Sequence, residues 1–143
     1  MNKTTLYPTT KDGCQWYIID ADSKTLGRLA SEAARILLGK NSPNYNPSRN
    51  IGNGLIIINA EKIQVTGKKE TDKFYRRHSG QVGGMKLETF GELRDRMPGR
   101  VIEKSIKGML PKGPLGRQLF TQLKVYKGSE HPHSAQQPTT VNI

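Results

Sequence analysis

The residues best suited to chemistry are cations that stand together without acids. Between Lys104 and Lys127 the chain carries six Lys and Arg residues and no Asp or Glu. These cations are Lys104, Lys107, Lys112, Arg117, Lys124 and Lys127. Apolar residues recur through the same stretch, so it has a side to bury. A folded segment with an exposed side of one sign must meet a polyanion or tolerate its own repulsion. This pattern indicates nucleic-acid binding.

A second basic set precedes it, diluted by Glu70 and Asp72. It comprises Lys62, Lys68, Lys69, Lys73, Arg76 and Arg77. A charge run usually marks a solvated surface, but Lys and Arg outnumber Asp and Glu by 23 to 12, giving a net charge of +11. One Trp and three Phe are too few for the series of aromatic side chains on which a single-strand binder stacks successive bases. Phosphate-dominated recognition of folded RNA fits better, with no DNA expected.

Glycine-rich segments offer weaker signals. The loop at residues 80–86 (GQVGGMK) has little side chain between its backbone and a phosphate, although an ordinary turn explains it equally well. Gly39-Lys40 and Gly67-Lys68-Lys69 resemble the end of a Walker loop but lack its first Gly and its Ser or Thr. No nucleotide cofactor is expected.

Metal and catalytic patterns are poorer still. His131 and His133 lie two apart, with His78 distant, whereas zinc needs three or four ligands. Ser79 beside His78 is no triad, because neighbours on a strand point to opposite faces. The acids are scattered, so only a dyad assembled in space would support an enzyme.

The composition suits one domain of 143 residues. A single cysteine, Cys14, excludes an internal disulfide and fits a reducing compartment. No apolar run approaches the roughly 18 residues of a membrane span, and the polar N-terminus is no secretory signal. We expect no membrane partner. We also expect that the protein functions in the compartment where it is synthesised, or that a targeting segment has already been removed from it.

The apolar periodicity predicts an α/β domain over residues 1–143. Strands are expected at 16–20, 55–59 and 123–126, with a short extended piece at 62–66, and helices at 26–37, 89–97, 101–109 and 114–120. In the last three helices Met97 and Met109 are assigned to the apolar stripes. Residues 1–13 should form a loose arm and 129–143 an extended tail. The continuously apolar strand at 55–59 favours a parallel sheet covered on both faces.

Short sequence motifs along the chain resemble those of the bacterial-type large-subunit ribosomal protein thirteen family. The matching runs are WYIIDA at 16–21, LGRLAS at 26–31, NAEK at 59–62, TGKK at 66–69, YRRHSG at 75–80, KGMLPK at 107–112, LKVYKG at 123–128 and HPHSAQQP at 131–138. The stretch at 75–90 looks most like cyanobacterial and plastid members. Two departures are Asn53, where the family usually has Asp, and Gln81-Val82, which replaces a pair with a cation or Tyr before Pro.

The resemblance implies a structural protein of the large ribosomal subunit, in a bacterial cytoplasm or plastid stroma. Its partners would be ribosomal RNA and neighbouring ribosomal proteins. It would join early in assembly and fold as an α/β/α sandwich around about four mostly parallel strands.

The residues expected to contact RNA are Arg28, Lys40, Lys68, Lys69, Arg76, Arg77, His78, Lys107, Lys112, Arg117, Lys124, Lys127, His131 and His133. The rival is an RNA-modifying or nucleotide-using α/β enzyme. The RNA helices, the neighbouring proteins and the choice of bacterium or plastid stay open.

Overall fold

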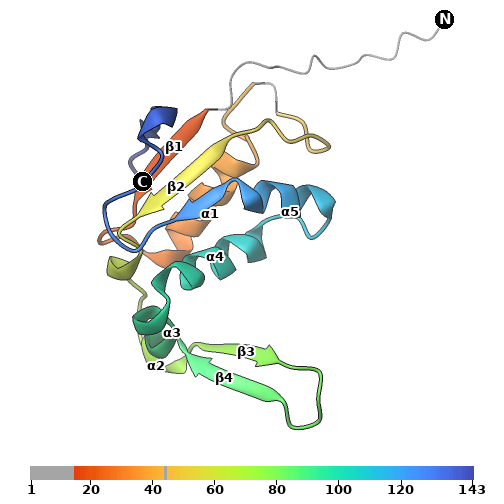
Figure 1. Cartoon of the computed structure of the whole chain (residues 1–143), viewed down its shortest axis with the longest axis vertical. Helices are drawn as coiled ribbons and strands as arrows, with labels where there is room; N and C mark the ends of the chain where they lie inside the picture. Colours follow the sequence, from red (N-terminus) through yellow and green to blue (C-terminus); the bar gives the residue numbers. More distant parts are fainter. Residues whose placement is uncertain (1–14, 44) are drawn as a thin grey trace, which may run out of the picture.

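A four-stranded parallel sheet organises the molecule in the computed structural model, which describes residues 15–43 and 45–143 (Figure 1). The strands stand in the order β5-β2-β1-β6. Their bounds are Trp16–Asp20 (β1), Gly54–Ile58 (β2), Leu123–Val125 (β5) and Thr139–Thr140 (β6). Helices pack around this sheet, which confirms the predicted α/β class. The expected N-terminal arm and Cys14 lie outside the described residues.

One face of the sheet carries the core. Alternation along the strands directs Ile19, Leu55, Ile57 and Leu123 to this face, and all four are buried. Helices α1 (Leu26–Leu37) and α4 (Pro98–Met109) cover it and pack on each other. Leucine, isoleucine and alanine at helical spacing give α1 its buried stripe, as predicted.

Gly39 ends α1 as the sequence predicted. Its φ of +73° is the left-handed conformation that stops many helices, and an added Cβ would lie 2.4 Å from the Ile51 side chain. Asn53, which is buried, satisfies a carbonyl in the last turn: its Nδ2 donates to the Ile36 oxygen at 3.0 Å. An ionised aspartate could not donate this bond.

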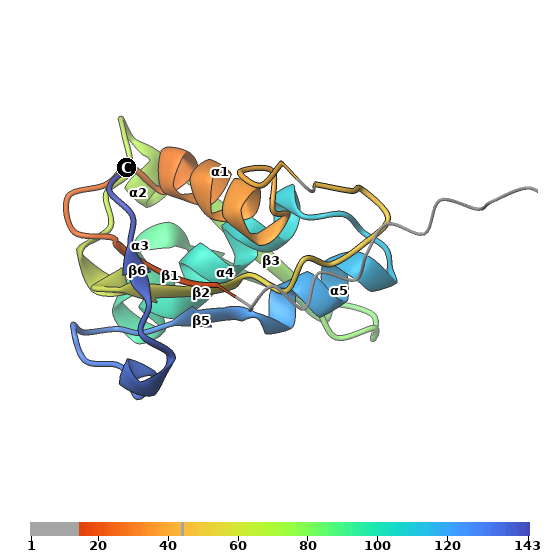
Figure 2. The same ribbon diagram turned by 90° about the horizontal axis from the view of Figure 1, so that it is seen from above.

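The C-terminal segment covers the opposite face. Trp16 lies on that face against Gly54, where an added Cβ would come within 2.5 Å of the indole. The His133 ring stacks on Trp16 with 5.5 Å between ring centroids. The segment expected as an extended tail contains the 3₁₀ turn η2 (Ser134–Gln136) and then β6, which pairs in parallel with β1. Seen from above, α1 and η2 lie on opposite sides of the sheet (Figure 2).

A hairpin arm projects from this body (Figure 1). It consists of β3 (Phe74–His78) and β4 (Met85–Thr89), joined antiparallel, with α2 (Lys69–Asp72) and α3 (Phe90–Arg96) at its base. The sequence predicted only a charged exposed stretch and a glycine loop there. Thr89 caps α3 as expected, in a reciprocal capping box with Glu92.

Smaller elements complete the chain. Helix α5 (Pro114–Thr121) begins at its proline, as predicted. The expected extended piece at 62–66 starts one residue later than predicted, because Lys62 ends the 3₁₀ turn η1 (Ala60–Lys62). Within the piece, Gln64 makes a single bridge to Thr25. The predicted inward placement of Met97 and Met109 is wrong, since they are 37% and 45% exposed. Met97 lies just before Pro98, where α3 ends and the helical stripe is interrupted.

Candidate nucleic-acid interface

Tyr75 joins the two basic sets that the sequence kept apart. Its ring lies under the Lys104 ammonium, with Nζ 4.7 Å from the ring centroid, and the Lys73 Nζ is 5.6 Å from the same centroid. Both lysines gain from the negative face of the ring. Burial raises the pKa of the Tyr75 hydroxyl, so it stays a neutral phenol at physiological pH. The fold therefore brings strand β3 and helix α4 together into one positive surface.

A basic groove of about 560 Å³ lies between the hairpin arm and helices α3 and α4. Its cations are Arg77, Lys86, Arg96, Arg100 and Lys104. Glu88 is its one carboxylate, and Arg96 binds it at 2.6 Å. Arg100 pairs with Glu103 at 3.8 Å. Arg77, Lys86 and Lys104 add positive charge to the groove without an ion pair, and a concave wall of one sign concentrates the electric field.

The cations predicted from the sequence are exposed, and most of them lack an ionic partner. Among the described residues only Lys127 of this set forms an ion pair, with Glu61 at 3.8 Å. The ten others make none: Arg28, Lys40, Lys68, Lys69, Arg76, Arg77, Lys107, Lys112, Arg117 and Lys124. A cation without a carboxylate is ready to neutralise an external phosphate.

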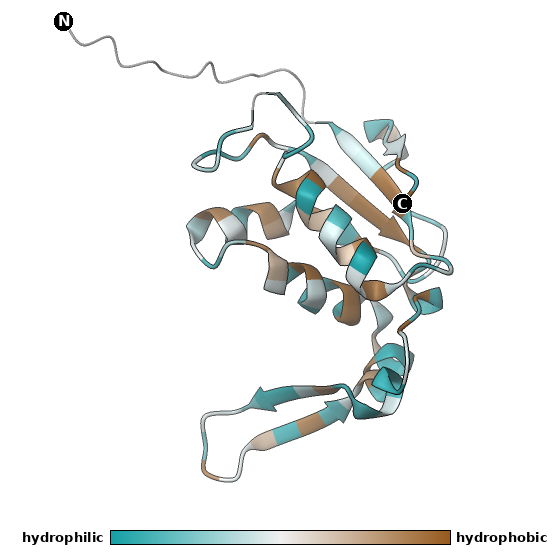
Figure 3. Cartoon of the chain, turned by 180° about the vertical axis from the view of Figure 1, so that it is seen from behind, coloured by the Kyte–Doolittle hydropathy of each residue, from teal (hydrophilic) through white to brown (hydrophobic). Residues whose placement is uncertain are grey.

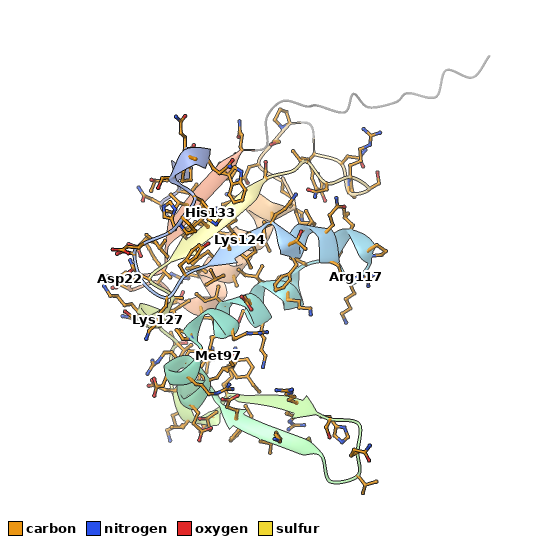
Figure 4. The ribbon with its side chains drawn as sticks, viewed as in Figure 1. Asp22, Met97, Arg117, Lys124, Lys127 and His133 are labelled. Carbon is orange, nitrogen blue, oxygen red and sulfur yellow. The ribbon has the colours of Figure 1, made fainter. Side chains whose placement is uncertain are left out.

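These cations do not form one patch. Lys124 lies on the sheet face that carries His133, whereas Arg117 lies on α5 at the far end of the body (Figure 4). Lys127 lies at the opposite edge of the body (Figure 4), where it pairs with Glu61. The positive potential therefore points in several directions, which suits a protein surrounded by polyanion more than one docked through a single face.

The three histidines make contacts within the chain. The Nε2 of His133 lies 2.7 Å from the Tyr126 hydroxyl, and the Nδ1 of His131 accepts the His133 amide. The His78 Nδ1 accepts from the Gly80 amide at 3.0 Å, so this ring holds the start of the glycine loop. Their expected contacts with RNA stay a prediction.

Sequence reasoning missed part of the groove. Lys86, Arg96, Arg100 and Lys104 were not among the residues chosen, although all four line it. Two signals were available: alternation across a hairpin at 74–89 puts Arg77 and Lys86 opposite each other, and a spacing of four puts Arg100 and Lys104 on one helix face.

Catalytic chemistry finds little support in the geometry. The side-chain hydrogen bond from Asn59, with help from the Asp22 amide, holds the pKa of Asp20 below its usual value. A carboxylate of that kind stays ionised and is a poor proton donor. No group of three or more potential metal ligands occurs among the described residues. Within the same part of the chain, no helix has both the length and the apolar character needed to cross a bilayer.

Fold and surface together define a class: a small α/β protein whose exposed cations face in several directions. The profile of the family described as Ribosomal protein L13 matches residues 14–132. The chain is 57% identical over 143 residues to "Large ribosomal subunit protein uL13" of Synechococcus sp. (strain CC9902), covering 100% of this chain and 95% of that protein. It is 59% identical over 141 residues to "Large ribosomal subunit protein uL13c" of Guillardia theta, covering 99% of each. The chain belongs to the ribosomal protein L13 family.

Proposed function

We propose that this chain is a structural constituent of the large ribosomal subunit that binds and organises ribosomal RNA, early in assembly. One observation carries the proposal: ten exposed cations without ionic partners among the described residues lie on one sheet face, on the helices, in the loops and on the arm. A rigid body with this charge distribution can hold several RNA segments in one arrangement. Its place of action would be the ribosome of a bacterial cytoplasm or plastid stroma.

Family membership favours this reading over an RNA-modifying enzyme. The cyanobacterial and Guillardia relatives are named as large ribosomal subunit proteins, and their similarity to this chain covers 95% and 99% of their lengths. Neighbouring ribosomal proteins are the second partner class, because exposed apolar side chains on the arm offer contacts that phosphates do not use.

Sedimentation tests the proposal directly. The tagged chain, expressed in a cyanobacterium, should co-sediment with large subunits at one copy per particle and persist through a modest salt wash. A modifying enzyme would be substoichiometric, and that result would overturn the proposal.

The purified chain gives a second measure with fragments of large-subunit RNA. If about seven phosphates are contacted, the log–log dependence of affinity on salt should have a slope near −6. A slope shallower than about −2 would contradict phosphate-dominated binding.

A further inference from the structure

A second cleft, on the other side of Tyr75, has a different character from the basic groove. It has a volume of about 730 Å³ and lies between the N-terminus of α1, the 64–66 segment, α2, β3 and α4. This volume falls within the range of small-ligand pockets, about 300–1,000 Å³. We call it the Tyr75 cleft.

The walls of the Tyr75 cleft combine apolar surface with positive charge. Leu26, Val65 and Met109 line it, and this explains why Met109 is half exposed on a helix stripe that otherwise faces the core. Lys69, Lys73 and Lys104 also line it, against the single carboxylate of Asp72. Asp72 accepts from the Thr71 hydroxyl and pairs with none of these lysines.

One lining hydroxyl lacks a partner. The Thr25 Oγ1 is buried without a hydrogen bond, whereas the Tyr75 hydroxyl has the Ser105 hydroxyl as its neighbour and partner, and Ser105 itself donates to the Val101 carbonyl. Buried polar groups in proteins nearly always have a partner, so the unpartnered Thr25 hydroxyl indicates a polar ligand group in addition to an apolar one.

The start of α1 opens onto the same cleft. Its N-cap residue, Thr25, makes no side-chain capping bond, and no acid stands in the first turn. The Leu26 amide already donates to the Gln64 carbonyl at 2.9 Å. The next two amides, of Gly27 and Arg28, have no acceptor within the helix and favour a negative charge beside them. Gly27, in the cleft wall, would meet nothing within 4 Å if it carried a Cβ, so a ligand can approach its backbone.

We propose that the Tyr75 cleft takes up one unstacked nucleotide of the bound RNA, with the base against its apolar wall and the phosphate among its lysines and the α1 amides. A base has an apolar face and a polar edge, which match the apolar residues and the unpartnered Thr25 hydroxyl. An uncharged apolar peptide would leave both the lysines and this hydroxyl unsatisfied. The inference rests on the proposed function for its source of RNA, but its test does not.

The test uses the isolated full chain labelled with ¹⁵N and titrated with 5′-AMP or 5′-UMP. At least one nucleotide should give saturable amide shifts below about 10 mM. These shifts should centre on Gly27, residues 64–66 and Gly108. Adenosine alone and inorganic phosphate alone should each bind at least tenfold more weakly. Diffuse shifts over the basic surface, or phosphate binding as tightly as the nucleotides, would overturn the proposal.

Two variants sharpen the result. Gly108→Phe places a ring in the cleft from a helical position where an added Cβ meets nothing, so it should fold normally and lose nucleotide binding at least tenfold. Thr25→Val should raise the melting temperature, because it removes a buried orphan hydroxyl, yet weaken nucleotide binding. If Thr25 had only a structural role, a higher melting temperature would not be accompanied by weaker nucleotide binding. Unchanged nucleotide binding in both variants would refute the site.

A charge-matched control separates the cleft from general attraction. Lys104→Met should weaken nucleotide binding more than Lys112→Met, which removes an exposed cation outside the cleft. If both chains still co-sediment with large subunits but neither nucleotide binds the parent chain, the cleft proposal fails while the proposed function stands.

Discussion

The sheet body and the hairpin arm use their apolar residues in opposite ways. Along β2, Leu55, Ile56 and Ile57 are fully buried, whereas Phe74, Met85 and Leu87 on the arm are each more than half exposed. Figure 3 displays the contrast: β2 is brown, and the arm is largely teal with isolated apolar positions. The body therefore concentrates the stabilising burial, and the arm presents surface.

The pairing register explains the exposure on the arm. Phe74, Leu87 and Met85 share one face of the ribbon with Arg76 and His78, and the opposite face carries Tyr75 toward α4. A two-stranded ribbon is marginally stable by itself in water. Its anchor here is the Tyr75 contact and α3, so the outer face is available for a partner without any loss of core.

The largest effect should come from truncation in the body. Ile57→Ala should lower the free energy of unfolding by about 2–5 kcal/mol, because it leaves a cavity in the core. Leu87→Ala on the arm should cost about 0.5 kcal/mol or less. Urea unfolding at pH 7 measures both. Equal losses would show that the arm is as integral to stability as the sheet.

The second sheet face should respond next. Gly54→Ala forces a Cβ to within 2.5 Å of Trp16, and such overpacking costs about 1–3 kcal/mol. Trp16 is the only tryptophan in the chain, so its fluorescence reports the displacement. Gly108→Ala, at an open helical position, is the control and should not destabilise the protein. Unaltered emission from the Gly54 variant would mean that the indole is not held against the sheet.

The arm should matter for RNA and not for stability. Replacing Arg76 and Arg77 by Ala should reduce the magnitude of the salt slope by about 2, while the melting temperature stays the same. The control replaces Arg35 and Arg94, which pair with Glu32 and Glu70 at 3.0 and 2.6 Å, and should change the slope less. A similar slope change in both would indicate a net-charge effect without local contacts.

The smallest effect concerns Asp20 at the end of β1. Its pKa is lowered in the folded state, so its contribution is complete above the unfolded value near 3.8 and is lost as pH falls through the folded pKa. The carboxylate is exposed, so the loss is small. Asp20→Asn should show a shallower decline in stability than the parent between pH 5 and pH 3 in urea unfolding. An identical decline would mean that Asn59 and the Asp22 amide do not stabilise the carboxylate.

Local signals in the chain were sufficient for the elements of the body. The helical spacing in α1, the αL glycine after it and the apolar run of β2 each have a physical cause that acts within a few residues. The expectation of exposed cations was equally local, because Lys and Arg are almost never buried unpaired.

The hairpin escaped prediction although β4, with the sequence MKLET, alternates between apolar and polar residues. The sequence of β3, FYRRH, does not alternate, so no second strand was evident to pair with β4. The apolar residues Phe74, Met85 and Leu87 face outward, so burial did not mark the strands either. Strand β6 escaped because two threonines give no pattern at all. Only pairing with β1 makes them a strand.

By itself, the sequence determined the α/β class, the helices around the sheet and the excess of positive charge. Its motifs also determined the family. Only the tertiary structure decided that Lys73 and Lys104 meet over Tyr75, that His133 packs on Trp16, and that Thr25 and Tyr75 share a cleft. The physical reason is the distance along the chain over which each effect acts. Propensity, capping and periodicity act over a few neighbours, whereas a binding surface depends on which distant segments the packing of the core brings side by side.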